Sequence, residues 1–297
     1  MKIMITGIRG FLGSALVRSF FQEGDTVCGT SSREAGATGA LPPDIKIARL
    51  SLGDPVSSRI FAKIDYVIHC AHDFSPGALE QNVEGTRRIF EAAKSSGVPL
   101  QAFVSSYSAT PSSVTEYGKA KFELEKFFEE NAGIILKPGL VLGSGGLGGR
   151  MLNIMRKSWI FPIPSGVRFP YVGLKDFVRT VRKIASTGQT GLYKIFYSDL
   201  TSFTEIAAAV KMDTGRPLFT IMVPVKTISF GLSAVECLLD RLRIRLPVRS
   251  DSFKSLEANQ VIRGGANRGL LPASHTTLQE VVSTAVRELD DAVFMGS

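Results

Sequence analysis

The chain has 297 residues, 44% apolar and 21% charged, and can therefore bury the core of one large domain, or of one domain and a smaller lobe. Its net charge of +8 fits an anionic ligand or surface, but no nucleic-acid recognition motif accompanies the charge, which excludes nucleic acid as the predicted partner. Cys28, Cys70 and Cys237 form no C-x-x-C pair, so a disulfide framework and a cysteine metal site are excluded and a reducing compartment is indicated.

Strand and helix patterns alternate along the first 140 residues. Apolar runs predict strands at 2–6, 26–30, 45–50, 65–70, 101–105 and 134–137, and helical spacing predicts helices at 13–23, 83–94 and 117–130. Repeated strand–helix units of this length imply a parallel sheet that is covered on both faces. The predicted fold class is therefore α/β, a doubly wound parallel sheet with ligands beyond the carboxyl ends of its strands.

The first strand runs into a glycine-rich turn, Thr6-Gly7-Ile8-Arg9-Gly10-Phe11-Leu12-Gly13. Glycines at this spacing let the backbone approach a pyrophosphate, and the N-terminus of the following helix offers free N–H groups and the positive end of its dipole. A turn of this kind can also serve only to pack a strand against a helix, so the motifs that accompany it decide whether it predicts a nucleotide site.

Three further polar residues follow in a set order. Ser106 lies at the carboxyl end of the strand 101–105, and Tyr117 and Lys121 are four residues apart, on one face of the helix 117–130. An ammonium group beside a phenol favours the phenolate, so we expect a lowered pKa for Tyr117, which makes it a candidate proton donor or acceptor. Each residue alone also fits a surface pair or a strand-ending serine. The order of glycine turn, serine and Y-x-x-x-K carries the prediction.

After Pro138 the alternation ends. Six glycines between 139 and 149 predict a mobile loop near a ligand, or a surface linker. Ser202 to Glu205 and Thr277 to Glu280 match the S/T-x-x-E capping box at helix starts. We predict a Rossmann-type domain over 1–150 and a smaller, mainly helical substrate lobe over 151–297, with strands and helices that return to the core.

The stretch 218–239 is apolar and long enough for a membrane span, but Pro224, Lys226 and Glu236 argue against one. A helix over 226–242, which runs into the arginine cluster at 241–249, would either cover the substrate lobe or lie on a membrane surface. No signal peptide precedes the first strand, which agrees with a cytoplasmic location.

Taken together, these motifs resemble the extended branch of the short-chain dehydrogenase/reductase superfamily, which contains nucleotide-sugar epimerases, dehydratases and reductases. Besides the turn and the Ser/Tyr/Lys set, the matching segments are D-x-V-x-H-x-A at 65–71, N-x-x-G-T at 82–86, the R-P-x-x-V-Y-G-like 137–143, Y-V-x-V-x-D at 171–176 and T-L at 277–278.

The resemblance implies that Tyr117 exchanges a proton with a substrate oxygen, that Lys121 holds ribose hydroxyls and depresses the tyrosine pKa, and that Ser106 orients the same oxygen. The implied activity is hydride transfer between a nicotinamide and the carbon of a sugar, nucleotide-linked or otherwise anionic, in a reductase or epimerase. A non-catalytic NAD(P)-binding scaffold or regulator of the same fold is the alternative. Many relatives form homodimers through the helices that match 83–94 and 117–130.

The implied cofactor positions are Thr6, Gly7, Arg9, Gly10, Phe11, Leu12, Gly13, Ser31, Ser32, Arg33, Cys70, Ala71, His72, Asn82, Ser105, Lys121, Lys137, Pro138 and Gly139. NAD-preferring members carry an acidic residue after the second strand, whereas Ser31-Ser32-Arg33 suits a 2′-phosphate and Arg9 could pair with it. We therefore predict NADP rather than NAD, unless both arginines are ordinary surface charges.

The chain also departs from the family pattern. The segment between Ser106 and Tyr117 is shorter than in many extended members, Leu142 and Ser144 stand where Tyr and Pro are usual, and His72 replaces a small residue. His72 is either structural or in contact with the substrate. The mouth of the site is therefore expected to be more open or differently lined.

Overall fold

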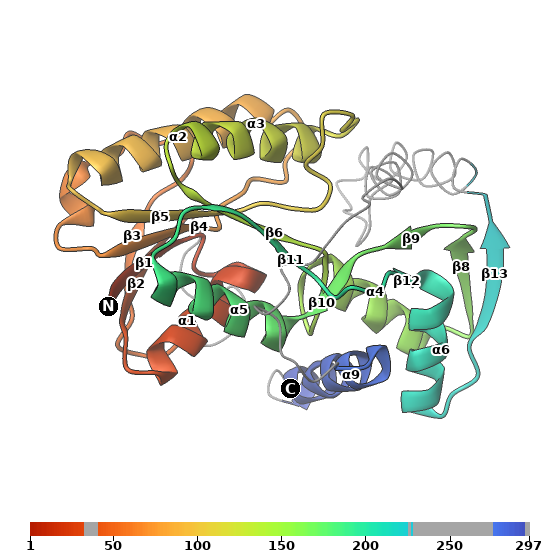
Figure 1. Cartoon of the computed structure of the whole chain (residues 1–297). Helices are drawn as coiled ribbons and strands as arrows, with labels where there is room; N and C mark the ends of the chain where they lie inside the picture. Colours follow the sequence, from red (N-terminus) through yellow and green to blue (C-terminus); the bar gives the residue numbers. More distant parts are fainter. Residues whose placement is uncertain (33–40, 225–226, 228–275, 295–297) are drawn as a thin grey trace. The chain divides into compact units, whose positions relative to one another are not determined.

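The computed structural model describes residues 1–32, 41–224, 227 and 276–294. Its main sheet has seven parallel strands in the order β11-β6-β5-β4-β1-β2-β3 (Figure 1). These strands are β1 (Lys2–Thr6), β2 (Thr26–Ser31), β3 (Lys46–Arg49), β4 (Tyr66–His69), β5 (Leu100–Val104), β6 (Ile134–Pro138) and β11 (Gly191–Ile195). The strand order reverses between β1 and β4, as in a doubly wound sheet. The predicted fold class is confirmed.

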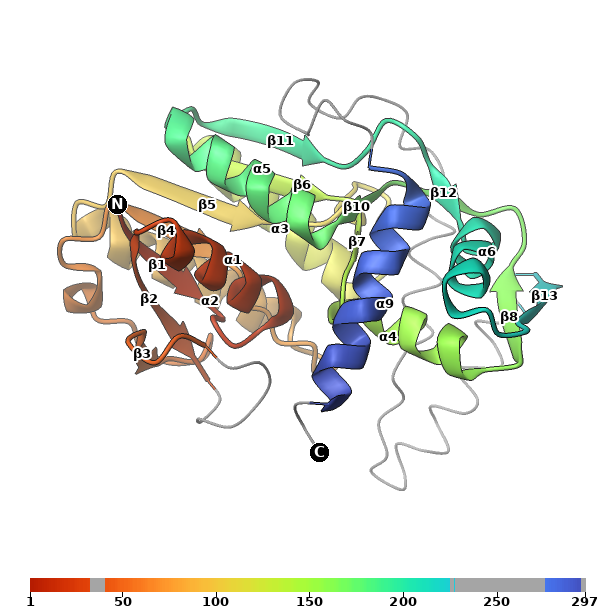
Figure 2. The same ribbon diagram turned by 90° about the horizontal axis from the view of Figure 1, so that it is seen from below.

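Helices cover both faces of this sheet. α2 (Leu79–Ser95) and α3 (Glu116–Glu130) lie side by side on one face, and α1 (Phe11–Gln22) and α5 (Leu174–Thr187) lie on the other (Figures 1 and 2). A short 3-10 helix, η1 (Ser58–Phe61), precedes β4. The sequence placed the start of α2 at residue 83, four residues late, because the first turn of the helix is largely polar.

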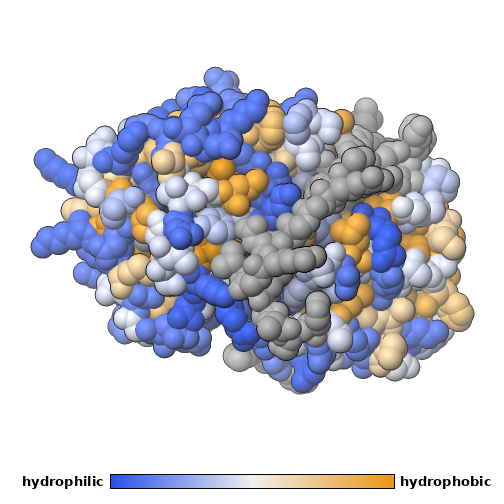
Figure 3. All heavy atoms as spheres, viewed as in Figure 1, coloured by the Kyte–Doolittle hydropathy of each residue, from blue (hydrophilic) through white to orange (hydrophobic). Residues whose placement is uncertain are grey.

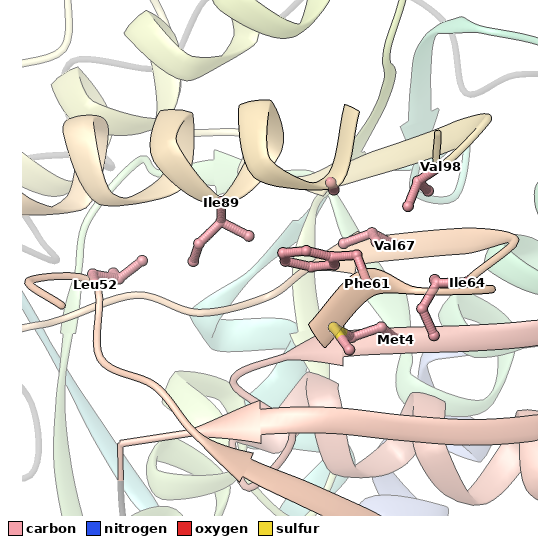
Figure 4. Packing of buried hydrophobic residues seen from close by; sticks show 8 residues of the cluster. Met4, Leu52, Phe61, Ile64, Val67, Ile89 and Val98 are labelled. Carbon is pink, nitrogen blue, oxygen red and sulfur yellow. The ribbon is translucent and has the colours of Figure 1, made fainter. Parts of the chain in front are cut away.

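The core between α2 and the sheet explains why these elements form. Met4, Leu52, Phe61, Ile64, Val67, Ile89, Ala93 and Val98 make one buried cluster (Figure 4). The strands β1 and β4 are apolar along nearly their whole length, as expected where both faces of a parallel sheet are buried. Burying each large apolar side chain contributes about 1.5–3 kcal/mol, so this cluster holds the end of β1 that carries the glycine turn.

The chain divides into two compact units. Unit 1 comprises Met1–Pro111, Glu116–Pro138 and Lys175–Ile195, and unit 2 comprises Ser112–Thr115, Gly139–Leu174 and the described residues from Phe196 onward. The chain thus leaves the sheet after β6 and rejoins unit 1 for α5 and β11. The assignment of 1–150 to the cofactor and 151–297 to the substrate stays a prediction.

Unit 2 is built from helices and short strand pairs. Its helices in the described ranges are α4 (Gly146–Lys157), α6 (Phe203–Thr214) and α9 (Leu278–Phe294). Its strands pair as β7 (Leu140–Leu142) with β10 (Tyr171–Gly173), β8 (Ile160–Pro164) with β13 (Phe219–Val223), and β9 (Arg168–Phe169) with β12 (Thr201–Ser202). Among the described residues, no helix is long and apolar enough to cross a bilayer.

The glycine-rich stretch 139–149 corrects one prediction. It is not a loop throughout, since it contains β7 and the first turn of α4. A Cβ at Gly148 would lie 2.4 Å from the Val141 carbonyl oxygen, and one at Gly149 would lie 2.6 Å from that of Gly143. The glycines therefore serve the close packing of α4 against β7.

Both predicted capping boxes are present. The Ser202 hydroxyl accepts from the Glu205 N–H at 3.2 Å, and Glu205 accepts from the Ser202 N–H at 2.8 Å. Thr277 and Glu280 make the same reciprocal pair at the start of α9. Arg33, Cys237, most of the predicted helix 226–242 and the arginine cluster lie outside the described residues.

Candidate active site

The glycine turn brings backbone against backbone beyond the carboxyl end of β1. Gly7 has φ of +66°, and a Cβ there would lie 2.8 Å from the Cα of Ala71. A Cβ at Gly13 would lie 2.4 Å from the Gly7 carbonyl oxygen. Gly10 differs, because its Cβ would meet only the Gly7 oxygen, at 3.1 Å. Gly7 and Gly13 are therefore required by the turn itself, whereas a side chain at Gly10 would meet a single tight contact.

Gly10 is also the N-cap residue of α1, and no side chain caps this helix. The N–H groups of the first turn, at Phe11, Leu12 and Gly13, have no intrahelical partner, and the helix dipole adds a partial positive charge. An anion such as the pyrophosphate of a dinucleotide fits this arrangement. The turn thus has the donors and the close backbone approach that NAD(P) requires.

Thr6 ties the ends of the two central strands together. Its hydroxyl, 1% exposed, accepts hydrogen bonds from the N–H groups of Cys70 and Ala71, each at 3.1 Å. The two predicted positions after β4 therefore sit directly beside the glycine turn. Burial raises the pKa of Cys70 to about 12, so its thiol is neutral near pH 7.

The end of β2 lies next to the same turn. β1 and β2 are neighbours with Thr6 in register with Thr30, so Ser31 and Ser32 follow the strand that adjoins Thr6. Arg9 stands in the turn between β1 and α1. These residues therefore share the carboxyl edge of two adjacent strands, as expected for an adenosine-side pocket.

Ser106, Tyr117 and Lys121 converge within unit 1. Ser106 follows β5, where its hydroxyl bonds that of Ser108 at 2.9 Å, and its interaction with the Tyr117 phenol acts to lower the pKa of that phenol. One turn further along α3, the Lys121 Nζ lies 5.8 Å from the centre of the Tyr117 ring and donates to the Val104 carbonyl oxygen at 2.7 Å. Because an ammonium carries three N–H donors, Lys121 has further donors available for a ligand.

The electrostatics of the pair differ from the sequence-based expectation. Burial raises the pKa of Tyr117, and its hydrogen bond with Ser106 only partly opposes this. The Lys121 ammonium points at a backbone carbonyl rather than at the phenol, so it does not lower the tyrosine pKa. Burial lowers the pKa of Lys121 itself to about 8.

A buried ion pair that sequence reasoning missed lies behind Lys121. Glu125, one turn further along α3, accepts from the Ser105 hydroxyl at 2.5 Å and from the Lys137 Nζ at 2.9 Å. Lys137 also donates to the Ala109 carbonyl oxygen at 2.6 Å. The side chains of Ser105 and Lys137, predicted to contact the cofactor, are thus bound to Glu125. Together they hold both ends of the segment that carries Ser106.

Aromatic rings surround the Tyr117 phenol. The His72 ring meets it edge-on with centroids 4.9 Å apart, and the Phe74 ring stacks on it at 5.7 Å. Burial holds the pKa of His72 well below its usual range, so the imidazole is neutral. Phe74 is 72% exposed, which is unusual for so large an apolar side chain. No motif in the sequence indicated this residue.

Asn82 fixes the loop that carries these rings. Its side-chain oxygen accepts from the Asp73 N–H, and its amide donates to the carbonyl oxygens of Asp73 and Ala78, all at 2.8 Å. Asn82 was predicted to contact the cofactor, but in the structure its side chain binds this loop instead.

Pro138 ends β6, where its carbonyl oxygen accepts from the Tyr107 N–H at 2.9 Å. Gly139 begins the next segment of unit 2, with its Cβ position 2.5 Å from the Pro170 carbonyl oxygen.

Comparison with known proteins bears on this arrangement. Residues 3–133 match the NAD dependent epimerase/dehydratase family. No curated protein matches the chain in sequence.

Solved structures match its fold. A UDP-glucose 4-epimerase from Thermotoga maritima, solved with UDP-glucose, superposes with a TM-score of 0.71 at 20% identity over 99% of this chain and 100% of the other. A UDP-glucose 4-epimerase from Thermus thermophilus in complex with NAD superposes with a TM-score of 0.69 at 17% identity, over 98% of this chain and 100% of the other. A nucleoside-diphosphate-sugar epimerase from Staphylococcus aureus gives 0.73 at 16% identity, over 95% and 100%.

At these identities the superpositions show the fold, while the family match covers the glycine turn, β4 and the Ser/Tyr/Lys residues. Residues 3–133 thus match the NAD dependent epimerase/dehydratase family, and the fold of the chain is that of the solved nucleotide-sugar epimerases.

Proposed function

We propose that this chain is an NAD(P)-dependent enzyme that acts on a nucleotide-linked sugar, with Tyr117 as the acid/base group. The observation that supports this most is the convergence of Ser106, Tyr117 and Lys121 beside one another, with the serine hydroxyl bonded to the phenol. The solved epimerases of the same fold carry UDP-glucose or NAD according to their descriptions, which supports the substrate and cofactor classes.

In this proposal each residue has one task. The raised pKa keeps the Tyr117 phenol protonated near neutral pH, so it donates a proton to a substrate carbonyl oxygen. Ser106 holds the same oxygen and fixes its distance from the phenol. The Lys121 ammonium binds ribose hydroxyls. A bound nicotinamide supplies the hydride that the carbonyl carbon receives.

The glycine turn and the N-terminus of α1 bind the pyrophosphate in this proposal, and Ser31, Ser32 and Arg9 bind the adenosine side. Because serines, and no acidic residue, occupy positions 31 and 32 at the end of β2, we propose a preference for NADP. A homodimer through α2 and α3 remains a prediction. Net consumption of NADPH would mark a reductase, whereas turnover with cofactor recycled would mark an epimerase.

Replacing Gly10 with Asp separates nucleotide binding from folding. Asp is a favourable N-cap residue, and its Cβ would meet the Gly7 carbonyl oxygen at 3.1 Å, so we expect these two small effects to leave the melting temperature of Gly10→Asp close to that of the wild type. The same carboxylate occupies the anion site of α1, so binding of NADPH and NADH should be lost. Titration followed by nucleotide fluorescence measures the binding of NADPH and of NADH, and the wild type should bind NADPH more tightly than NADH. Undiminished NADPH binding by Gly10→Asp would remove the pyrophosphate from this turn.

The pH dependence of activity should report Lys121. Its pKa of about 8 means that the ammonium is present below this pH and is lost as the pH rises through it. We therefore expect kcat/KM to fall by up to about tenfold per pH unit above pH 8. Lys121→Arg keeps its charge at every accessible pH and should lose this alkaline limb. A wild-type profile that stays level to pH 9.5 would contradict the role given to the ammonium.

A further inference from the structure

The strand pair β8 and β13 of unit 2 has an apolar face that the described residues leave uncovered. Ile160 pairs in register with Phe219, and Pro162 pairs with Ile221. Because alternate residues of a strand point to one face, these four side chains share that face. Ile160, Phe219 and Ile221 are 59%, 64% and 53% exposed, and Pro162 is exposed as well.

This ribbon is nevertheless a firmly attached part of unit 2. The Phe219 N–H donates to the Trp159 carbonyl oxygen at 2.8 Å, and the Ser165 N–H donates to that of Val223 at 3.1 Å. On its other face Ile163 is only 1% exposed, and β8 contacts α6. The exposed side chains therefore belong to a built element and not to a frayed end.

Further large apolar side chains are exposed in and next to this strand pair, and one of them, Met222, is in register with Ile163 and lies on the opposite face of the pair. Trp159, which leads into β8, is 68% exposed, Met222 of β13 is 71% exposed and Met212 at the end of α6 is 74% exposed. Apolar side chains gather in Figure 3 along the edge where β8 and β13 lie in Figure 1. We call these residues, with Ile160, Pro162, Phe219 and Ile221, the apolar end. Several large exposed apolar side chains gathered at one end of a unit are typical of an interaction site.

Basic side chains border the apolar end. Lys157 precedes Trp159, Lys211 precedes Met212, and Arg216 lies three residues before Phe219, all exposed. Of the carboxylates, Asp213 is the nearest in sequence, and Ser283 hydrogen-bonds it.

We propose that the apolar end docks this protein onto the surface of an anionic lipid bilayer. Apolar side chains and a tryptophan with basic neighbours match the interface of such a bilayer, where rings insert among headgroups and cations meet lipid phosphates. A second copy of this chain, the other candidate occupant, is distinguished by the experiment below. This proposal does not depend on the proposed activity.

The chain contains one tryptophan, Trp159, so the apolar end carries its own fluorescent reporter. In buffer the emission should be that of an exposed indole. Added vesicles of phosphatidylcholine with phosphatidylglycerol should shift it to the blue, brominated lipids should quench it, and high salt should weaken both effects. Vesicles of phosphatidylcholine alone should act much more weakly.

The matched variants change only exposed side chains. Phe219→Ser combined with Ile221→Ser should weaken vesicle binding at least about tenfold, because two apolar side chains no longer enter the bilayer. Leu192→Ser, at an apolar position of β11 that is 46% exposed, should bind as the wild type does. Circular dichroism would verify that all three proteins fold alike.

Three results would overturn the proposal. If anionic vesicles leave the tryptophan emission of the wild type unchanged, the protein does not dock onto the bilayer through the apolar end. A blue shift without vesicles that grows with protein concentration identifies a second copy as the occupant. Blue emission at every concentration, unmoved by lipid, means that other residues of this chain cover the apolar end.

Discussion

Replacing Tyr117 with Phe should lower kcat by about 100- to 10,000-fold while the protein still folds and binds NADPH. The phenol hydroxyl is the proton donor in the proposed reaction, and phenylalanine keeps the ring that packs against His72 and Phe74. The loss should therefore fall on the chemical step, with KM changed little. Steady-state kinetics on a nucleotide-linked ketosugar, with NADPH titrated separately, would measure both.

A second tyrosine of unit 1 provides the control. The Tyr193 hydroxyl donates to the Gln189 carbonyl oxygen at 3.0 Å near the surface, so Tyr193→Phe removes a hydroxyl without touching the site. Its kcat should remain close to that of the wild type. Wild-type turnover by Tyr117→Phe would contradict the acid/base role. If instead the wild type holds NADPH tightly and reduces no ketosugar, the non-catalytic scaffold becomes the better account.

Removing Glu125 should have the largest effect on stability. Glu125 and Lys137 are mostly buried, with side chains 11% and 14% exposed, and their atoms lie 2.9 Å apart. Glu125→Ala leaves the Ser105 hydroxyl without its acceptor and the Lys137 ammonium without its counter-charge, with only the Ala109 carbonyl oxygen to accept from it. Removal of one partner of a buried pair typically costs about 3–5 kcal/mol, and we expect a loss of this size in urea unfolding followed by circular dichroism.

The same helix offers a matched exposed pair. Glu123 meets Arg87 at 3.0 Å, with side chains 47% and 33% exposed. Water screens this pair, so Glu123→Ala should cost about 0–1 kcal/mol. Glu125→Leu combined with Lys137→Met should recover much of the stability that Glu125→Ala loses, because no unpaired charge stays at that position. Equal losses for Glu123→Ala and Glu125→Ala would refute the importance of the buried pair.

The sequence predicted the first half of the fold well because its signals are local. Apolar runs and the glycine turn placed the first six strands of the sheet within a residue or two of their observed ends. The return of β11 to β6 is a long-range pairing that no local pattern locates. The glycines at 148 and 149 misled for a related reason, since they fit a helix against a strand rather than open a loop.

The sequence predicted Ser106, Tyr117 and Lys121 as one candidate set, and the structure brings them together, but the sequence did not predict the contacts that hold them. The tyrosine pKa was wrong in direction, because spacing along a helix does not reveal burial or where the lysine nitrogen points. Glu125 follows Lys121 by four residues, so the Y-x-x-x-K-x-x-x-E spacing could have placed it on the same face of α3. The partners of Ser105 and Lys137 depend on tertiary packing.

The side-chain amide of Asn82 fixes both ends of a short exposed loop beside Tyr117, so the residues within that loop can vary. Asn82 anchors Asp73 and Ala78, while residues 74–77 between them are all exposed. Changing the length or the residues of this four-residue span would leave the start of α2 in place. Exchanging Phe74 would change the ring stacked on Tyr117, the proposed proton donor, and leave the Asn82 anchor in place, which makes the span a natural target for directed evolution.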